Sequence, residues 1–327
     1  TRRLSTDDFQ CGGEDLPSLT LAVTGAASGG VLKDNLVEIV ATPELRGHRL
    51  RKVQLFSGRM VLRTLEAADP GKAADGLACR ILFPTGRNRI HARLWFDGNH
   101  SVDSENVLEF ETRELIEGPW EFTRLGHKFP IAVRCKDGRA SFTGEGFYVG
   151  TQKVTGDFTL TARIADIVLA TKENGVHGAN WLGLYTSNVS RPRKDQGGES
   201  TFNQWGFSIY RTAGRGMKGT ADFPDLGGGR MGIPSFPPDH RWLRIVRTGK
   251  RFQAFTSADG TRWEKAMERI SKKFTDEQYV GVCFRAVPGK GRGVFQGALD
   301  HMTLERGKVP TEVRGTPRPS DLRMENR

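Results

Sequence analysis

Residues 241–263 contain two β-hairpins in series. Apolar and polar residues alternate along both segments, which is typical of strands that pack one face on a core. The turns at Thr248-Gly249-Lys250 and Asp259-Gly260 each hold the glycine that a tight hairpin turn needs for its positive φ. The segment therefore predicts a three-stranded antiparallel meander. The apolar residues that it offers to a core include Trp242, Ile245, Phe252 and Phe255.

The composition fits a chain built from β-sheets. The sequence has 327 residues, of which 40 are glycine and 37% are hydrophobic, which is enough for two cores and too much glycine for a helical protein. From Leu16 to Thr112, about seven short alternating runs are separated by Gly, Pro and Asn turns, which is the rhythm of a β-sandwich. No stretch is long and apolar enough for a transmembrane helix.

Positive charge is concentrated in the second half of the chain. The net charge is +11. Up to Ile116 there are 15 basic and 16 acidic residues, whereas the rest of the chain has 34 basic and 22 acidic residues. Such a field favours an anionic partner: an acidic or sulfated glycan, an anionic lipid surface or nucleic acid. A solvated surface is the alternative. No recognition helix or familiar aromatic series accompanies the arginines, so we expect no specific nucleic-acid binding.

The second half carries the motif R-x-G-x-x-F followed by S-x-D-G-x-x-W. Its residues are Arg247, Gly249, Phe252, Ser257, Asp259, Gly260 and Trp263. With the strands around it, residues 139–306 resemble the concanavalin-like, laminin-G-like jelly-roll family of bacterial extracellular proteins. The resemblance implies a secreted, periplasmic or cell-surface location, a carbohydrate ligand and, as the usual ion on such folds, Ca²⁺.

The first half carries two shorter patterns, V-x-L-F-x-S-G and G-x-N-x-I-x-A. Their residues are Val53, Leu55, Phe56, Ser57 and Gly58, then Gly86, Asn88, Ile90, Ala92 and, further on, Asp97. Residues 16–112 resemble the bacterial immunoglobulin-like modules. The expected fold is therefore all-β: an immunoglobulin-like sandwich followed by a concanavalin-like jelly-roll sandwich.

Five segments make up the expected organisation. We expect an N-terminal arm at 1–15, the immunoglobulin-like sandwich at 16–113, a connector at 114–130, the jelly roll at 131–306 and an extended or disordered tail at 307–327. No long linker separates the two sandwiches. No signal peptide stands at Thr1, so we expect a trimmed precursor or a fragment.

Aromatic and polar residues interleave on three predicted strands of the jelly roll. Aromatic rings stack on sugars, and amide and guanidinium groups bind hydroxyl and carboxylate groups. The competing interpretation is a plain sandwich core, which must bury one face of each strand. The predicted ligand-binding residues are Tyr148, Asn180, Tyr185, Gln204, Tyr210 and Arg211, together with the basic run Arg191, Arg193 and Lys194.

Two aspartates are the candidate calcium ligands. Asp157 and Asp300 would meet if the first and last strands of the jelly roll pair, and two hydrogen-bonded aspartates are the alternative. Asp157 and Asp259 also fit as carboxylates that cap backbone N–H groups. The cysteines Cys11, Cys79, Cys135 and Cys283 lack metal-site spacing. They leave open a disulfide such as Cys11 with Cys79, or buried thiols.

No catalytic set emerges from the residues. No Ser/His/Asp or Cys/His arrangement can be proposed, and the Glu-x-Asp-x-x-Glu strand signature of laminarinase-type jelly rolls is missing. The leading hypothesis is a non-catalytic secreted or cell-envelope protein that binds carbohydrate, in particular anionic glycan. The alternatives are a structural subunit of a surface layer, fibre or larger complex, with other cell-surface proteins as partners, and a glycan-acting hydrolase.

Overall fold

The computed structural model is all-β in every part that it describes, as the sequence predicts. The described residues are 16–24, 29–66, 76–97, 100–125, 132–144, 146–169, 181–188, 206–212, 219–220, 236–270, 274–286 and 294–307. They form strands and no helix. They accordingly contain no helix that is long and apolar enough to cross a membrane. The chain divides into two compact units, Thr1–Arg113 and Glu114–Arg327.

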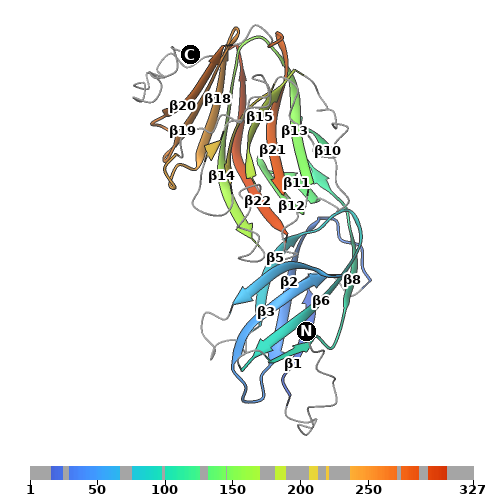
Figure 1. The fold of residues 1–327 in the computed structure, drawn as a ribbon. Helices are drawn as coiled ribbons and strands as arrows, with labels where there is room; N and C mark the ends of the chain where they lie inside the picture. The colour runs from blue at the N-terminus through green and yellow to red at the C-terminus, as the bar shows by residue number, and fades with distance from the viewer. Residues whose placement is uncertain are drawn as a thin grey trace, which may run out of the picture. The chain divides into compact units, whose positions relative to one another are not determined.

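Unit 1 is a sandwich of a three-stranded and a five-stranded sheet (Figure 1). The smaller sheet has the order β1-β2-β5, and the larger one the order β4-β3-β6-β7, with β8 also paired to β6. Its strands are β1 (Ser18–Val23), β2 (Leu36–Glu44), β3 (Leu50–Ser57), β4 (Met60–Glu66), β5 (Leu77–Leu82), β6 (Gly86–Phe96), β7 (His100–Asp103) and β8 (Leu108–Thr112).

Alternation along these strands builds the core of unit 1. In β2 every second side chain, including Val37, Ile39 and Ala41, is buried. This period of two is the geometry of a strand with one face on a core. Phe83 and Phe110 complete the interior with an edge-to-face contact whose ring centroids are 5.0 Å apart.

Unit 2 is a larger sandwich of a six-stranded and an eight-stranded sheet. The six-stranded sheet has the order β10-β13-β21-β15-β16-β17 and the eight-stranded sheet the order β20-β19-β18-β14-β22-β12-β11-β9. The first sheet contains β10 (Glu121–Leu125), β13 (Gly146–Thr155), β21 (Glu277–Ala286), β15 (Trp181–Ser187), β16 (Gly206–Thr212) and β17 (Gly219–Thr220). The second contains β20 (Glu264–Ile270), β19 (Arg251–Ser257), β18 (Trp242–Thr248), β14 (Phe158–Leu169), β22 (Phe295–Arg306), β12 (Arg139–Gly144), β11 (Ala132–Lys136) and β9 (Leu115–Ile116).

Aromatic side chains fill the space between the two sheets of unit 2. Phe284 of the six-stranded sheet stacks between Phe142 and Phe295 of the eight-stranded sheet, with centroid distances of 5.3 and 5.0 Å. All three rings are almost completely buried. Because stacked rings bury large apolar areas, this layer is a main source of cohesion between the sheets.

The predicted meander is confirmed as β18, β19 and β20. Gly249 lies in the first turn with φ 59° and Gly260 in the second with φ 78°. Ile245 and Phe252 belong to the core, and Phe255 is also fully buried. Trp242 does not belong to the core, because it lies three residues from Ile245 and so on the opposite face of its strand.

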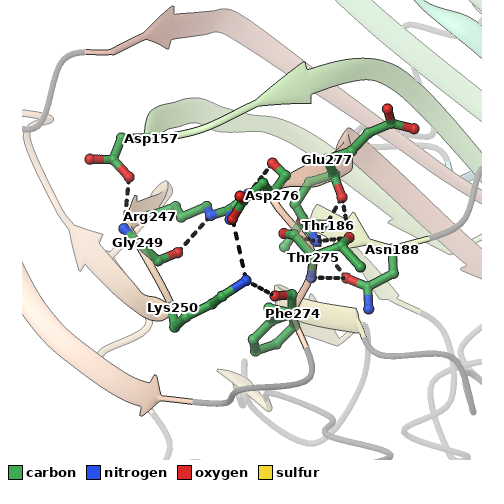
Figure 2. A network of polar contacts seen from close by, with 11 residues as sticks. Asp157, Thr186, Asn188, Arg247, Gly249, Lys250, Phe274, Thr275, Asp276 and Glu277 are labelled. Atoms are coloured by element: carbon green, nitrogen blue, oxygen red, sulfur yellow. Dashed lines mark hydrogen bonds and ion pairs between the residues drawn. The ribbon is translucent and has the colours of Figure 1, made fainter.

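A buried arginine ties the meander to the start of β21 (Figure 2). Arg247 is 1% exposed. Its Nε donates to the carbonyl oxygen of Gly249 at 2.8 Å, and its Nη1 donates to that of Asp276 at 2.7 Å. Lys250 reaches the same loop, where its Nζ donates to the carbonyl oxygen of Phe274 at 2.5 Å. The motif arginine is therefore a structural anchor.

Other expectations have mixed outcomes. The segment expected as a connector supplies two strands to unit 2, β9 and β10. The N-terminal arm and almost all of the tail lie outside the described residues. Cys11 lies there too, so its pairing with Cys79 stays a prediction. No disulfide joins Cys79, Cys135 and Cys283, and the thiol of Cys283 contacts the carbonyl oxygen of Leu184 at 3.7 Å.

Candidate functional site

Two of the predicted ligand-binding tyrosines lie inside the protein. Tyr148 is 9% exposed and belongs to the core between the sheets. Tyr185 is 2% exposed and lies on the other face of the six-stranded sheet, because its neighbour Leu184 is in the core. Burial raises the pKa of Tyr185, although its hydrogen bond with Ser187 acts in the opposite direction. The placement of Tyr148 favours the core interpretation, whereas Tyr185 is buried on the face that points away from this core.

The remaining predicted ligand residues are not described in full. Tyr210 and Arg211 belong to β16, but their side chains lie outside the described parts of the structure. The other five, Asn180, Arg191, Arg193, Lys194 and Gln204, are also outside the described residues. Their role in ligand binding stays a prediction.

The two candidate calcium ligands do not form a site together. The strands β14 and β22 do pair, but Asp300 lies opposite Arg163, six residues along β14 from Asp157. Six residues of strand span about 20 Å, so one ion cannot contact both carboxylates. Asp157 instead accepts a hydrogen bond from the N–H of Gly249 at 2.7 Å, as expected for a capping carboxylate. The described residues contain no group of three or more His, Cys, Asp or Glu that could hold a metal.

A row of charged and aromatic side chains crosses the outer face of the eight-stranded sheet. Strand register places Lys136 of β11 opposite Arg139 of β12. Farther across the sheet, Arg163 of β14 lies between Asp300 of β22 on one side and Trp242 of β18 on the other. Arg139 directly precedes Ala140, which pairs with Leu299, so Arg139 comes next to Asp300. Ala140, Leu299 and Leu243 are buried and point into the core. By alternation, the row points away from it.

An open depression lies at the β11–β12 end of this row. Its volume is about 440 Å³. It is lined by Arg134, Lys136, Asp137, Gly138, Arg139, Asp300, His301, Met302 and Thr303. Within the described part of the chain, no carboxylate forms an ion pair with Lys136 or Arg139. With three basic side chains, Arg134, Lys136 and Arg139, against the carboxylates of Asp137 and Asp300, the depression carries a net positive charge.

Asp300 is held as a carboxylate by its neighbours. Arg163 donates two hydrogen bonds to it, from Nε to Oδ1 at 2.9 Å and from Nη2 to Oδ2 at 2.7 Å. His301 Nδ1 lies 3.0 Å from Asp300 Oδ1. The Arg163 hydrogen bonds lower the pKa of Asp300 to about 2, and the contact with His301 adds to this. The pair also fixes the orientation of the Arg163 guanidinium, since a bidentate contact has specific geometry.

Trp242 lies beside this ion pair, and the Asp259-Gly260 turn packs against its indole ring. Its ring centroid is 5.7 Å from the Arg163 guanidinium carbon and 5.1 Å from the ring of His301, in an edge-to-face arrangement. A Cβ atom on Gly260 would lie only 2.8 Å from Trp242 Cε2. The turn therefore needs glycine both for its positive φ and to leave room for the indole.

A second indole lies beside Trp242 on the same face. The guanidinium carbon of Arg244 is 3.8 Å from the centroid of the Trp263 ring, and Arg244 Nε donates to Thr161 Oγ1 at 3.2 Å. Trp263 remains partly exposed. Burial is the main cause of the lowered pKa of Arg244. The stack gives the face a rigid aromatic and cationic surface.

The carboxylate of Asp259 stabilises the turn under this surface, because it is bonded to backbone N–H groups of the turn itself. Asp259 Oδ1 accepts hydrogen bonds from the N–H groups of Thr261 and Arg262, both at 2.8 Å. Ser257 Oγ accepts from the N–H of Gly260 at 2.9 Å. The hydrogen bonds from Arg262 and Thr261 hold the pKa of Asp259 below its usual range. The expected capping role of this carboxylate is confirmed.

The sequence carries a local signal for one part of this face. Asp137-Gly138, between two alternating runs, is the same hairpin signal as Asp259-Gly260 and places Lys136 and Arg139 side by side. Both turn residues have positive φ, 52° and 70°. The contact of Arg163 with Asp300 joins residues far apart in the sequence and had no local signal.

Comparisons with known proteins show only likenesses of fold. No family model and no curated protein matches the sequence. The exoplasmic/lumenal domain of VIP36 in its Ca²⁺/Man3GlcNAc-bound form is 12% identical, with 62% of this chain and 87% of that chain covered and a TM-score of 0.40. A functionally unknown protein from Saccharomyces cerevisiae is 11% identical over 58% of this chain and 98% of that chain, with a TM-score of 0.33. A carbohydrate-binding module of the β-sandwich superfamily is 9% identical over 88% of this chain and 97% of that one, with a TM-score of 0.24.

Proposed function

We propose that this protein binds carbohydrate, in particular an anionic glycan, on the outer face of the eight-stranded sheet. The observation that carries the proposal is the combination of a basic depression with two partly exposed indoles on one sheet face. Indole faces stack on sugar rings, and guanidinium and ammonium groups bind carboxylate or sulfate groups. This is a different sheet face from the one on which the sequence placed the ligand.

The carboxylate of Asp300 on this face supports binding and not proton donation. A glycosidase needs a carboxylic acid with a raised pKa to protonate the leaving group. Asp300 has a lowered pKa and is occupied by Arg163. It therefore orients a cation and is unsuited to donate a proton.

A binding protein also agrees better with the surface than a structural subunit does. Among the described residues, few large apolar side chains are exposed, and exposed side chains of this kind are ordinary in monomers. They are Leu16, Val31, Val107, Ile116 and Ile270. The sequence resemblance to bacterial extracellular jelly-roll and immunoglobulin-like modules supports a secreted, periplasmic or cell-surface location as part of the proposal.

A glycan array with a salt titration tests the proposal. We expect binding to acidic or sulfated glycans that weakens as salt rises from about 0.05 to 0.5 M, because ions screen exposed charges. The double variant Lys136→Glu/Arg139→Glu should abolish it. These two residues are like-charged cross-strand neighbours, but Arg139 also lies next to Asp300. The reversal therefore places a second carboxylate beside Asp300, and a melting curve must verify that the variant folds.

Two further variants separate the candidate sites. Arg191→Glu/Arg193→Glu/Lys194→Glu tests the basic run that the sequence singled out. Lys33→Glu/Arg59→Glu reverses two exposed charges in unit 1 and controls for net charge. Loss of binding only in Lys136→Glu/Arg139→Glu supports the depression. Loss of binding only in the triple variant would show that the site is the basic run. Equal weakening in all three variants would show that the interaction is nonspecific attraction of charge.

A further inference from the structure

The proposed binding face is much longer than its depression. In the sheet order β11-β12-β22-β14-β18, Lys136 of β11 is four strand spacings from Arg244 of β18. Neighbouring strands are about 4.8 Å apart, so the backbones that carry the two side chains lie about 19 Å apart across the sheet. A single sugar ring in the depression does not reach the stack of Arg244 on Trp263.

The two ends of this face have different chemistry. The β11–β12 end carries the cations of the depression. The β18 end carries the two indoles, one beside Arg163 and one on Arg244. Between them lies the Arg163–Asp300 pair, with its guanidinium fixed in orientation. The series runs perpendicular to the strands without a change of sheet.

We infer that the ligand is an extended acidic polysaccharide that lies across the strands. Its charged groups bind at the depression and its following sugar rings stack on Trp242 and Trp263. This inference rests on the proposed function and names its ligand class. Once one end is bound, the other end binds without a second loss of translational freedom, so affinity rises with chain length.

Isothermal titration with oligosaccharides of two and eight sugars tests the inference. Two acidic series serve as probes: oligogalacturonates, which carry carboxylates, and chondroitin sulfate oligosaccharides, which also carry sulfates. The proteins are the native full chain, Arg139→Glu, Trp263→Ala and Trp263→Phe. The ring of Trp263→Phe keeps a stacking surface, and a melting curve for each variant verifies folding.

The variants distinguish a long site from simple attraction of charge. We expect the octamer to bind at least about ten-fold more tightly than the dimer. Trp263→Ala should weaken octamer binding about ten-fold, the size of one aromatic stacking contact, without changing dimer binding. Trp263→Phe should restore most of the length dependence. Arg139→Glu should weaken both lengths.

The opposite results would overturn the inference in a recognisable way. If Trp263→Ala weakens both lengths equally, or neither, the ligand does not extend to the β18 end, while binding that is lost in Arg139→Glu still supports the proposed function. If the native protein binds no length of either series, the proposed function fails together with the inference.

Discussion

Gly260 shows how one residue serves both the turn and the proposed binding face. Its φ of 78° is a left-handed conformation, and its missing side chain makes room for Trp242. Gly260→Ala should therefore destabilise unit 2 by strain of roughly 1 to 3 kcal/mol and, in addition, push the indole out of place. Chemical denaturation measures the first effect and glycan titration the second.

Gly156 provides a matched control for this substitution. Its φ is 80°, and a Cβ there would meet nothing within 4 Å. Gly156→Ala should show the strain alone and keep native binding. Equal losses of stability and binding in the two variants would contradict the claim that the Gly260 contact positions Trp242.

The Arg163–Asp300 pair should make stability depend on pH in a defined window. The pKa of Asp300 is about 2 in the folded protein and about 4 in an unfolded chain. Because the folded value is the lower one, the pair stabilises the fold fully above about pH 4, and this contribution disappears as pH falls toward 2. Native protein should therefore melt above Asp300→Asn at neutral pH, and the difference should shrink across that window.

An Arg163→Gln background tests the assigned cause. In this background, Asp300→Asn should produce a much smaller pH-dependent difference in melting temperature, because the main partner of the carboxylate is gone. An undiminished difference would show that some other group lowers the pKa of Asp300.

At the scale of elements, the sequence predicted the turns of the meander better than it predicted which side chains of each strand point into the core. Glycine at a tight turn is a local requirement, so both turns could be found. The face of each strand could not be assigned from hydrophobicity, because β18 has Trp242 on its outer face and buried Arg247 on its inner face. The period of two carried the missing information, since Trp242 and Ile245 are three residues apart and cannot share a face.

Arg247 should be the most sensitive charged residue of the meander. Arg247→Met would remove the donors to the Gly249 and Asp276 carbonyl oxygens (Figure 2). Losing hydrogen bonds from a buried charged group should cost roughly 2 to 4 kcal/mol of unfolding free energy, measured by urea denaturation. Arg251→Met is the control, because its contact with Glu268 is long, 3.8 Å, and half exposed. It should change stability by less than about 1 kcal/mol. Similar effects of both variants would refute the anchoring role.

At the scale of the whole molecule, the two-sandwich plan followed from the sequence, but the location of the proposed site did not. Alternating runs and turns are local, so they revealed β-strands in both halves of the chain. The proposed binding face depends on the order β11-β12-β22-β14-β18, which joins segments far apart in sequence. Alternation alone leaves two faces for each of two sheets. The aromatic and polar residues that interleave on three predicted strands pointed to the strands of the six-stranded sheet.

The division into two units predicts that unit 2 binds without unit 1. Each described sheet takes its strands from one unit only, and each unit has its own core. A fragment of residues 114–307 should unfold cooperatively and bind acidic glycans with native affinity, measured by melting and titration. A fragment that folds but binds at least about ten-fold more weakly would show that unit 1 contributes to the site.

The position of the two indoles gives the protein an optical signal of its own. Trp242 has the imidazole of His301 at its edge, and Trp263 is covered on one side by the guanidinium of Arg244. Indole emission responds to neighbouring cations and to exclusion of water, so a sugar on this face should shift the fluorescence spectrum. The chain has six tryptophans, and replacing Trp242 or Trp263 with phenylalanine would identify the ones that respond. Occupancy of the face could then be followed without any label.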